Sequence, residues 1–82
     1  MQRNFEFTLR LDVSESTGST YDLIERLANA GVNDALVGIG VASRLALQFD
    51  REAESVGAAF QSAFADVQRA TPEGKLIEAV FA

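Results

Sequence analysis

Apolar and polar residues alternate most regularly at the start of the chain and again in its middle. Within residues 4–13 every second residue from Phe5 onward is apolar, and the same period of two returns in residues 44–52. This period is typical of a strand with one buried face. We therefore predict a strand in each segment, with Leu45, Leu47 and Phe49 of the second strand facing the core.

A third strand is predicted at residues 35–41, just before the clearer strand at residues 44–52. Gly38 and Gly40 weaken its pattern and indicate a bulge or an edge position. The connection between the two strands is expected near Ala42 and Ser43. Because this connection lacks an Asn-Gly pair, its turn type and register are not predicted.

Helical spacing of apolar residues follows the first strand. Ser19 with Asp22 three residues later resembles a capping box, which predicts a helix start. The helix should bury a narrow stripe made of Leu23, Ile24, Leu27 and Ala28, with Tyr21 at its margin. Gly31 is expected to end it, because glycine readily adopts the left-handed conformation found past a helix end.

A second helix is predicted from Ser55, its N-cap, to the residue before Pro72. Its apolar residues follow helical spacing over three turns. The expected core-facing stripe is Val56, Ala59, Phe60, Ala63, Phe64 and Val67.

Residues 75–82 predict the fourth strand, with apolar side chains in both of its alternating sets. The set facing the core is either Leu76, Glu78 and Val80 or Ile77, Ala79 and Phe81. The other set must meet solvent or another subunit, because one helical layer covers only one face of a sheet. We therefore expect an interface that involves Leu76, Glu78, Val80 and Phe81, and a homodimer.

The element order is β-α-β-β-α-β within one domain that spans residues 1–82. Right-handed crossovers place the first and third strands in the centre and give the spatial order 4-1-3-2. We therefore predict an α+β, ferredoxin-like sandwich, in which two helices cover one face of a four-stranded antiparallel sheet.

Composition limits the function classes. The net charge is −5, and the seven basic residues are scattered, so nucleic-acid binding by this segment is not expected. The chain has no cysteine and no histidine. It has no apolar run of signal-peptide or membrane-helix length, so a cytoplasmic location is expected. General acid–base catalysis would rest on carboxylates with no partner base, so we expect no enzyme activity. We also expect no cofactor.

Two segments are candidate small-ligand sites. The loop before the first helix contains Ser16, Thr17, Gly18 and Ser19, and its amides could hold an anion, although helix capping explains the same residues. The acidic group Asp50, Glu52 and Glu54 offers oxygen ligands for a hard cation. Its spacing fits no calcium-binding loop, so a solvated strand end is the preferred interpretation and no metal site is expected.

Two stretches resemble a known family. They are residues 31–40 with residues 44–53, and residues 62–70 with Pro72 and Gly74. They are similar to a family of small, mostly uncharacterised bacterial ferredoxin-like domains, which often precede a helix-turn-helix DNA-binding segment. The resemblance implies a regulatory role. No recognition helix follows within residues 1–82, so DNA binding is not expected of this segment alone.

Two functions are therefore compatible with the sequence. The first is a non-enzymatic association or sensory module, such as the regulatory part of a bacterial transcription regulator or an antitoxin-like protein. The alternative is a small-ligand-binding domain of the amino-acid-sensing type, with its ligand at the loop of residues 14–20 near a subunit interface. The sequence names neither the ligand nor the partner.

Overall fold

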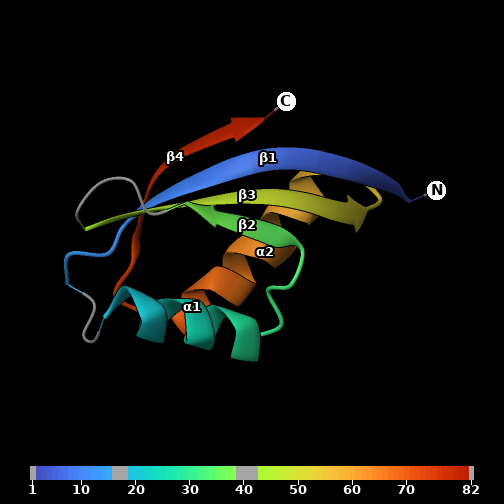
Figure 1. Cartoon of the computed structure of the whole chain (residues 1–82). Helices are drawn as coiled ribbons and strands as arrows, with labels where there is room; N and C mark the ends of the chain where they lie inside the picture. The colour runs from blue at the N-terminus through green and yellow to red at the C-terminus, as the bar shows by residue number, and fades with distance from the viewer. Residues whose placement is uncertain (1, 16–18, 39–42, 82) are drawn as a thin grey trace.

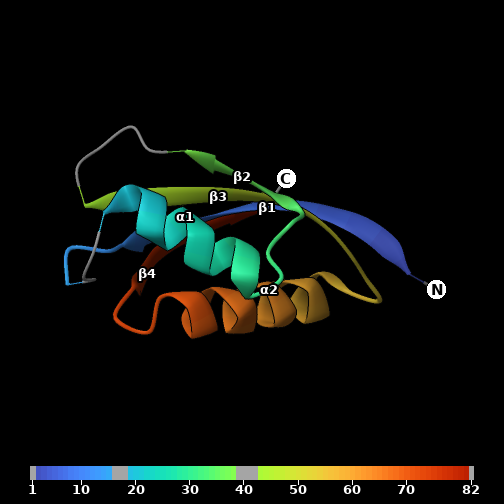
Figure 2. The same cartoon turned by 60° about the horizontal axis from the view of Figure 1, so that its bottom comes forward.

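The structure is a computed structural model that describes residues 2–15, 19–38 and 43–81. Its elements follow the predicted order: β1 (Arg3–Asp12), α1 (Thr20–Asn29), β2 (Ala35–Gly38), β3 (Arg44–Ala53), α2 (Val56–Ala70) and β4 (Lys75–Phe81). The strands form one antiparallel sheet, and both helices lie against the same face of it (Figures 1 and 2). The other face of the sheet has no helix over it and is called the open face below.

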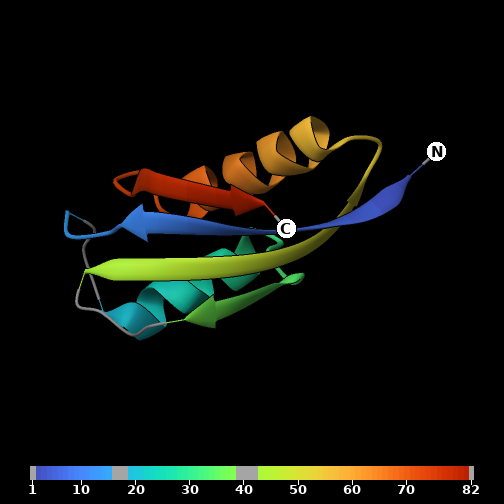
Figure 3. The ribbon, with the colours of Figure 1, turned by 90° about the horizontal axis from the view of Figure 1, so that it is seen from above.

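The strand order is β2-β3-β1-β4, which is the predicted order 4-1-3-2 counted from the opposite edge. The strands β1 and β3 are central, and β2 and β4 form the two edges (Figure 3). The α+β class with a four-stranded antiparallel sheet and two helices is therefore confirmed.

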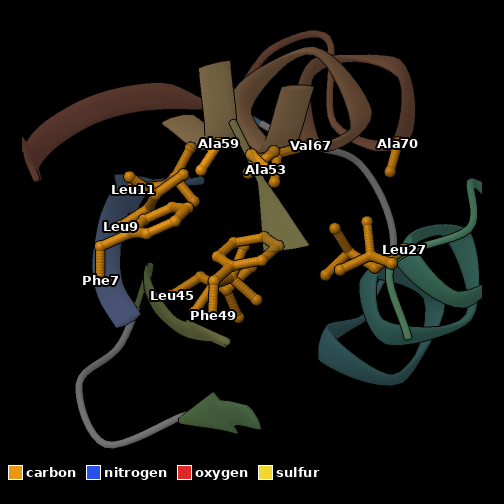
Figure 4. Close-up of a cluster of buried hydrophobic side chains, with 13 residues drawn as sticks. Phe7, Leu9, Leu11, Leu27, Leu45, Phe49, Ala53, Ala59, Val67 and Ala70 are labelled. Carbon is orange, nitrogen blue, oxygen red and sulfur yellow. The ribbon is translucent and has the colours of Figure 1, made fainter. Parts of the chain in front are cut away.

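The core forms where β1 and β3 face the helices (Figure 4). Directly opposed pairs across these strands are Phe7 with Phe49, Leu9 with Leu47, and Leu11 with Leu45. All six side chains are at most 2% exposed. The rings of Phe7 and Phe49 stack with their centroids 5.3 Å apart. The predicted inward phase of both strands is confirmed.

The capping box of α1 is confirmed, since the Ser19 hydroxyl accepts from Asp22 N and Asp22 accepts from Ser19 N. Gly31 has a φ of 91°, as its place past the helix end requires. Leu23 and Leu27 are buried, but Tyr21 is 82% exposed and Ala28 is also exposed. The predicted stripe was too wide, because Tyr21 points about 160° away from Leu23 around the helix.

Ser55 caps α2 by accepting from Ala58 N at 3.1 Å, and the helix ends at Ala70 before Pro72, as predicted. Its buried face is narrower than the predicted stripe and consists of Ala59, Ala63, Val67 and Ala70. Phe60 and Phe64 are half-buried, and Val56 is exposed. Alanines let the helix approach the sheet closely, so the larger side chains lie at the flank.

The strand β2 ends at Gly38, so its predicted continuation to residue 41 and the Ala42 part of the turn lie outside the described residues. Ser43, the next described residue, has a φ of 62°. Neither helix in the described part of the chain is long and apolar enough to cross a membrane.

Of the two alternations predicted for residues 75–82, the one with Ile77, Ala79 and Phe81 toward the core holds only for Ala79 and Phe81, because β4 contains a β-bulge. Arg10 pairs with Glu78, but its neighbour Leu11 pairs with Leu76, which leaves Ile77 as an extra residue. Leu76 therefore shares the core-facing side with Ala79 and Phe81, which pair with the buried residues of β1. Lys75, Glu78 and Val80 lie on the open face.

Candidate functional site

The loop expected to hold a small ligand contributes little to a described site. Ser16, Thr17 and Gly18 lie outside the described residues. The Ser19 side chain is engaged in capping α1 through Asp22. The ligand-binding role of this loop stays a prediction.

The acidic group after β3 is divided by a residue that points the other way. Asp50, Glu52 and Glu54 are exposed, as expected for a solvated strand end. Arg51 lies in the same alternating phase as Phe49 and Ala53, so its side chain points toward the helices and is 11% exposed. Within the described residues, no cluster of carboxylates suited to a metal ion is found.

Arg51 joins three parts of the fold. Its guanidinium forms a two-bond fork to Asp34, with Nε and Nη2 donating at 2.7 and 2.9 Å. Nη1 donates to Asp66 and Ser62 on α2 at 3.0 and 3.2 Å. The same group lies 5.1 Å from the centroid of the Phe49 ring. This arrangement fixes the segment before β2 and the helix α2 to β3 and is structural.

The fork changes the protonation of both partners. Hydrogen bonds from Arg51 lower the pKa of Asp34 below its usual value, more strongly than partial burial raises it. The pKa of Arg51 is raised, chiefly by the hydrogen bond to Asp34. Both groups therefore stay charged at neutral pH, which suits a fixed ion pair and not a proton-transfer group.

A shallow pocket of about 330 Å³ lies beside β2 and is lined by Glu6, Asn33, Asp34, Leu36 and Asp50, among others. Its lining includes three carboxylates, and the Asp34 carboxylate is already paired with Arg51. The lining contains no serine, threonine or lysine that could act as a nucleophile. The other two carboxylates, Glu6 and Asp50, belong to directly opposed residues of β1 and β3.

The free edge of β4 is the most unusual surface that the structure describes. Ile77, Val80 and Phe81 are 47%, 48% and 47% exposed, and all three lie on this one strand. The charges of β4 are paired within the chain, Lys75 with Glu15 at 3.1 Å and Glu78 with Arg10 at 3.4 Å. A long edge strand with exposed apolar residues is a template for pairing with another chain.

The four residues predicted to form an interface separate into two faces. Glu78 and Val80 lie on the open face, whereas Leu76 is half-buried on the helical side and Phe81 points to the same side. The structure places all four on the edge strand but does not make them one surface. Ile77, which was not predicted for the interface, is added by the bulge.

The helix α2 extends the apolar surface beside β4. Phe60 and Phe64 stack at 5.7 Å, and Phe60 meets Phe81 edge-on at 6.0 Å. Val56, one turn before Phe60, is 44% exposed. Seen from above the sheet, the N-terminal half of α2 reaches past β4 (Figure 3). The spacing of these residues was visible in the sequence, but it was assigned to the core.

The open face is mostly polar. One row across the sheet runs Leu36, Gln48, Thr8 and Val80, so its two apolar residues sit at opposite edges. Glu6 and Asp50 oppose each other in the next row. The open face is therefore not a continuous apolar patch. The buried aromatic residues of β1 and β3, Phe7 and Phe49, face the helices.

Comparison with protein-family models gave no match for this chain, and comparison with curated protein sequences gave none. The resemblance to bacterial domains that precede a helix-turn-helix segment therefore stays a prediction.

Proposed function

We propose that this chain is a non-enzymatic protein-association module that binds through the free edge of β4. The observation that carries this proposal is the exposure of Ile77, Val80 and Phe81, each close to half, on one edge strand. Backbone groups on such an edge supply hydrogen bonds to an added strand, and the side chains supply apolar contact.

The opposite edge is a weaker candidate for pairing. The described part of the opposite edge strand is β2, Ala35–Gly38. Leu36 is its only side chain among the large exposed apolar residues of the described chain. Among the described residues, β4 therefore exposes three large apolar side chains at its edge, whereas β2 exposes one.

The element order and strand order support a ferredoxin-like fold, which hosts many unrelated functions, so the fold alone does not define the role. The resemblance to regulatory domains of bacteria supports a regulatory role. In that role, pairing through β4 would bring two attached effector segments together. The net charge of −5 supports a protein partner rather than a nucleic acid.

The test compares two lysine substitutions at exposed apolar edge residues of the same row. Val80→Lys places a charge at the proposed contact, whereas Leu36→Lys places one at the other edge and serves as the matched control. Light scattering at micromolar concentrations should give a dimeric mass for the unchanged protein and for Leu36→Lys. Val80→Lys should be shifted toward monomer with its helical content intact.

Two results would contradict the proposal. One is a monomeric mass of the unchanged protein up to about 100 μM, which would mean association weaker than about −5.5 kcal/mol. The other is a dimer that Val80→Lys leaves unchanged and Leu36→Lys disrupts, which would move the contact to β2.

A further inference from the structure

The hydrogen-bond phase of the sheet determines which backbone groups of β4 are free. Val13 N donates to Ser43 O at 2.9 Å, and this pair continues the register of β1 with β3. Bonded and non-bonded pairs alternate along an antiparallel ladder, so odd-numbered residues of β1 bond to β3 and even-numbered ones turn toward β4.

The same alternation carries across to the edge strand. Thr8 and Arg10 turn toward β4, so their partners Val80 and Glu78 bond back to β1. Ala79 and Phe81 consequently direct their N–H and C=O groups to the free edge. In the regular part of β4 beyond the bulge, an added strand therefore forms its hydrogen bonds with these two residues.

This phase leaves few registers for a second copy related by a two-fold axis, which pairs β4 with itself in antiparallel fashion. A register centred on Glu78 would oppose two carboxylates about 4.5 Å apart between their Cα atoms, which is unfavourable. One centred on Ala79 would set Glu78 against the partner's Val80 and would continue into the bulge at Ile77.

A register centred on Val80 has neither fault. It opposes Val80 to the partner's Val80, two β-branched residues in a non-hydrogen-bonded pair, where side chains are closest. It also pairs Ala79 with the partner's Phe81 in a bonded pair, so that a small side chain lies beside a large one. All paired residues lie in the regular part of β4, beyond the bulge.

We infer that the partner of β4 is a second copy of this chain, paired antiparallel with Val80 on the two-fold axis, to form one continuous eight-stranded sheet. This inference rests on the proposed association function and adds the partner and the register. The N-terminal half of α2 reaches past β4 (Figure 3), so it would cover the helical side of the added strand. Val56, which is exposed, and Phe60, which is half-buried, belong to this half of the helix. The partner's Phe81 faces that same side.

Single-cysteine variants test the register, because the chain has no cysteine of its own. Opposed residues in a non-hydrogen-bonded pair have Cα atoms about 4.5 Å apart, within the range of a disulfide. Val80→Cys should therefore form a disulfide-linked dimer under mild oxidation. Its rate at micromolar protein should exceed that of Leu36→Cys, an exposed control for random collision, by about 100-fold.

Two neighbouring positions distinguish the other registers. In the inferred register, Glu78 lies four residues along the strand, or about 13 Å, from its counterpart, so Glu78→Cys should link no faster than Leu36→Cys. Ala79→Cys should also fail, since two residues along and one strand across separate the Cα atoms by about 8 Å. A mixture of Ala79→Cys and Phe81→Cys should link, although neither does alone.

Each outcome decides between the inference and the function on which it rests. Fastest linking of Glu78→Cys or Ala79→Cys alone overturns the register, while association through β4 stands. A dimeric unchanged protein in which Val80→Cys and the mixture both link no faster than Leu36→Cys overturns this interface. A monomeric unchanged protein overturns both proposals. The mixture gives an independent result should Val80→Cys fail to fold.

Discussion

Arg51 shows at the scale of one residue how an apparent surface charge can organise a fold. In the sequence it interrupts an acidic group, and the group was interpreted as a solvated strand end. In the structure its neighbours Asp50 and Glu52 are exposed, and its own side chain is 11% exposed between Asp34 and Asp66. The sequence does indicate this orientation, because Arg51 has the same place in the strand alternation as the core residues Leu47 and Phe49.

Replacing Arg51 tests this role. Arg51→Met keeps the length of the side chain but leaves Asp34 and Asp66 without their common partner. We expect unfolding free energy to fall by about 1–3 kcal/mol at pH 7, measured by urea denaturation. Arg69→Met is the matched control, since Arg69 also pairs with Asp66 but is 62% exposed. It should cost under about 1 kcal/mol. Equal losses of unfolding free energy in the two variants would contradict the role of Arg51 in joining Asp34 and Asp66.

The pH dependence of the same variant has a defined sign. Arg51 lowers the pKa of Asp34 in the folded state, so the pair stabilises the fold above the unfolded value of about 3.9. This contribution is lost as the pH falls through the folded pKa. The difference in urea midpoint between the unchanged protein and Arg51→Met should therefore narrow below about pH 4. A difference in urea midpoint that stays constant down to pH 2 would contradict a stabilising contribution from the Asp34–Arg51 pair.

At the scale of one element, β4 differs most from its prediction. Alternation placed β1 and β3 correctly, because each has one apolar set and one polar set. In residues 75–82 both sets are apolar, so the pattern contained no information on the bulge at Ile77. The same limit applies to α2, whose apolar residues fit both a core-facing stripe and a flank beside β4.

Two single-residue deletions test the bulge. Removing Ile77 should give a regular ladder, since Leu76 and Glu78 would then face Leu11 and Arg10 in sequence. We expect the thermal midpoint to stay near that of the unchanged protein. Removing Ala79 reverses the faces of Val80 and Phe81 and separates Phe81 from Phe7 and Phe60. That deletion should cost about 1–3 kcal/mol. The opposite ranking would show that Ile77 is a regular strand residue.

At the scale of the whole molecule, the two edges of the sheet are unequal. The sequence predicted the element order, the two central strands and the presence of two edges. It could not show that the charges of β4 are paired with Glu15 and Arg10, because those partners are distant along the chain. It also could not show that α2 reaches past β4. Both features depend on packing between segments, and both make β4 the edge open to another chain.

Hydrogen exchange at individual amides of β4 tests the central claim most directly. Ala79 and Phe81 direct their N–H groups to the free edge, whereas Glu78 and Val80 bond to β1 and serve as internal controls. If β4 pairs with a second copy, exchange at Ala79 and Phe81 should be slow at high protein concentration and should accelerate on dilution. Glu78 and Val80 should remain protected throughout. Rapid exchange at Ala79 and Phe81 at every concentration, with Glu78 and Val80 protected, would contradict the account.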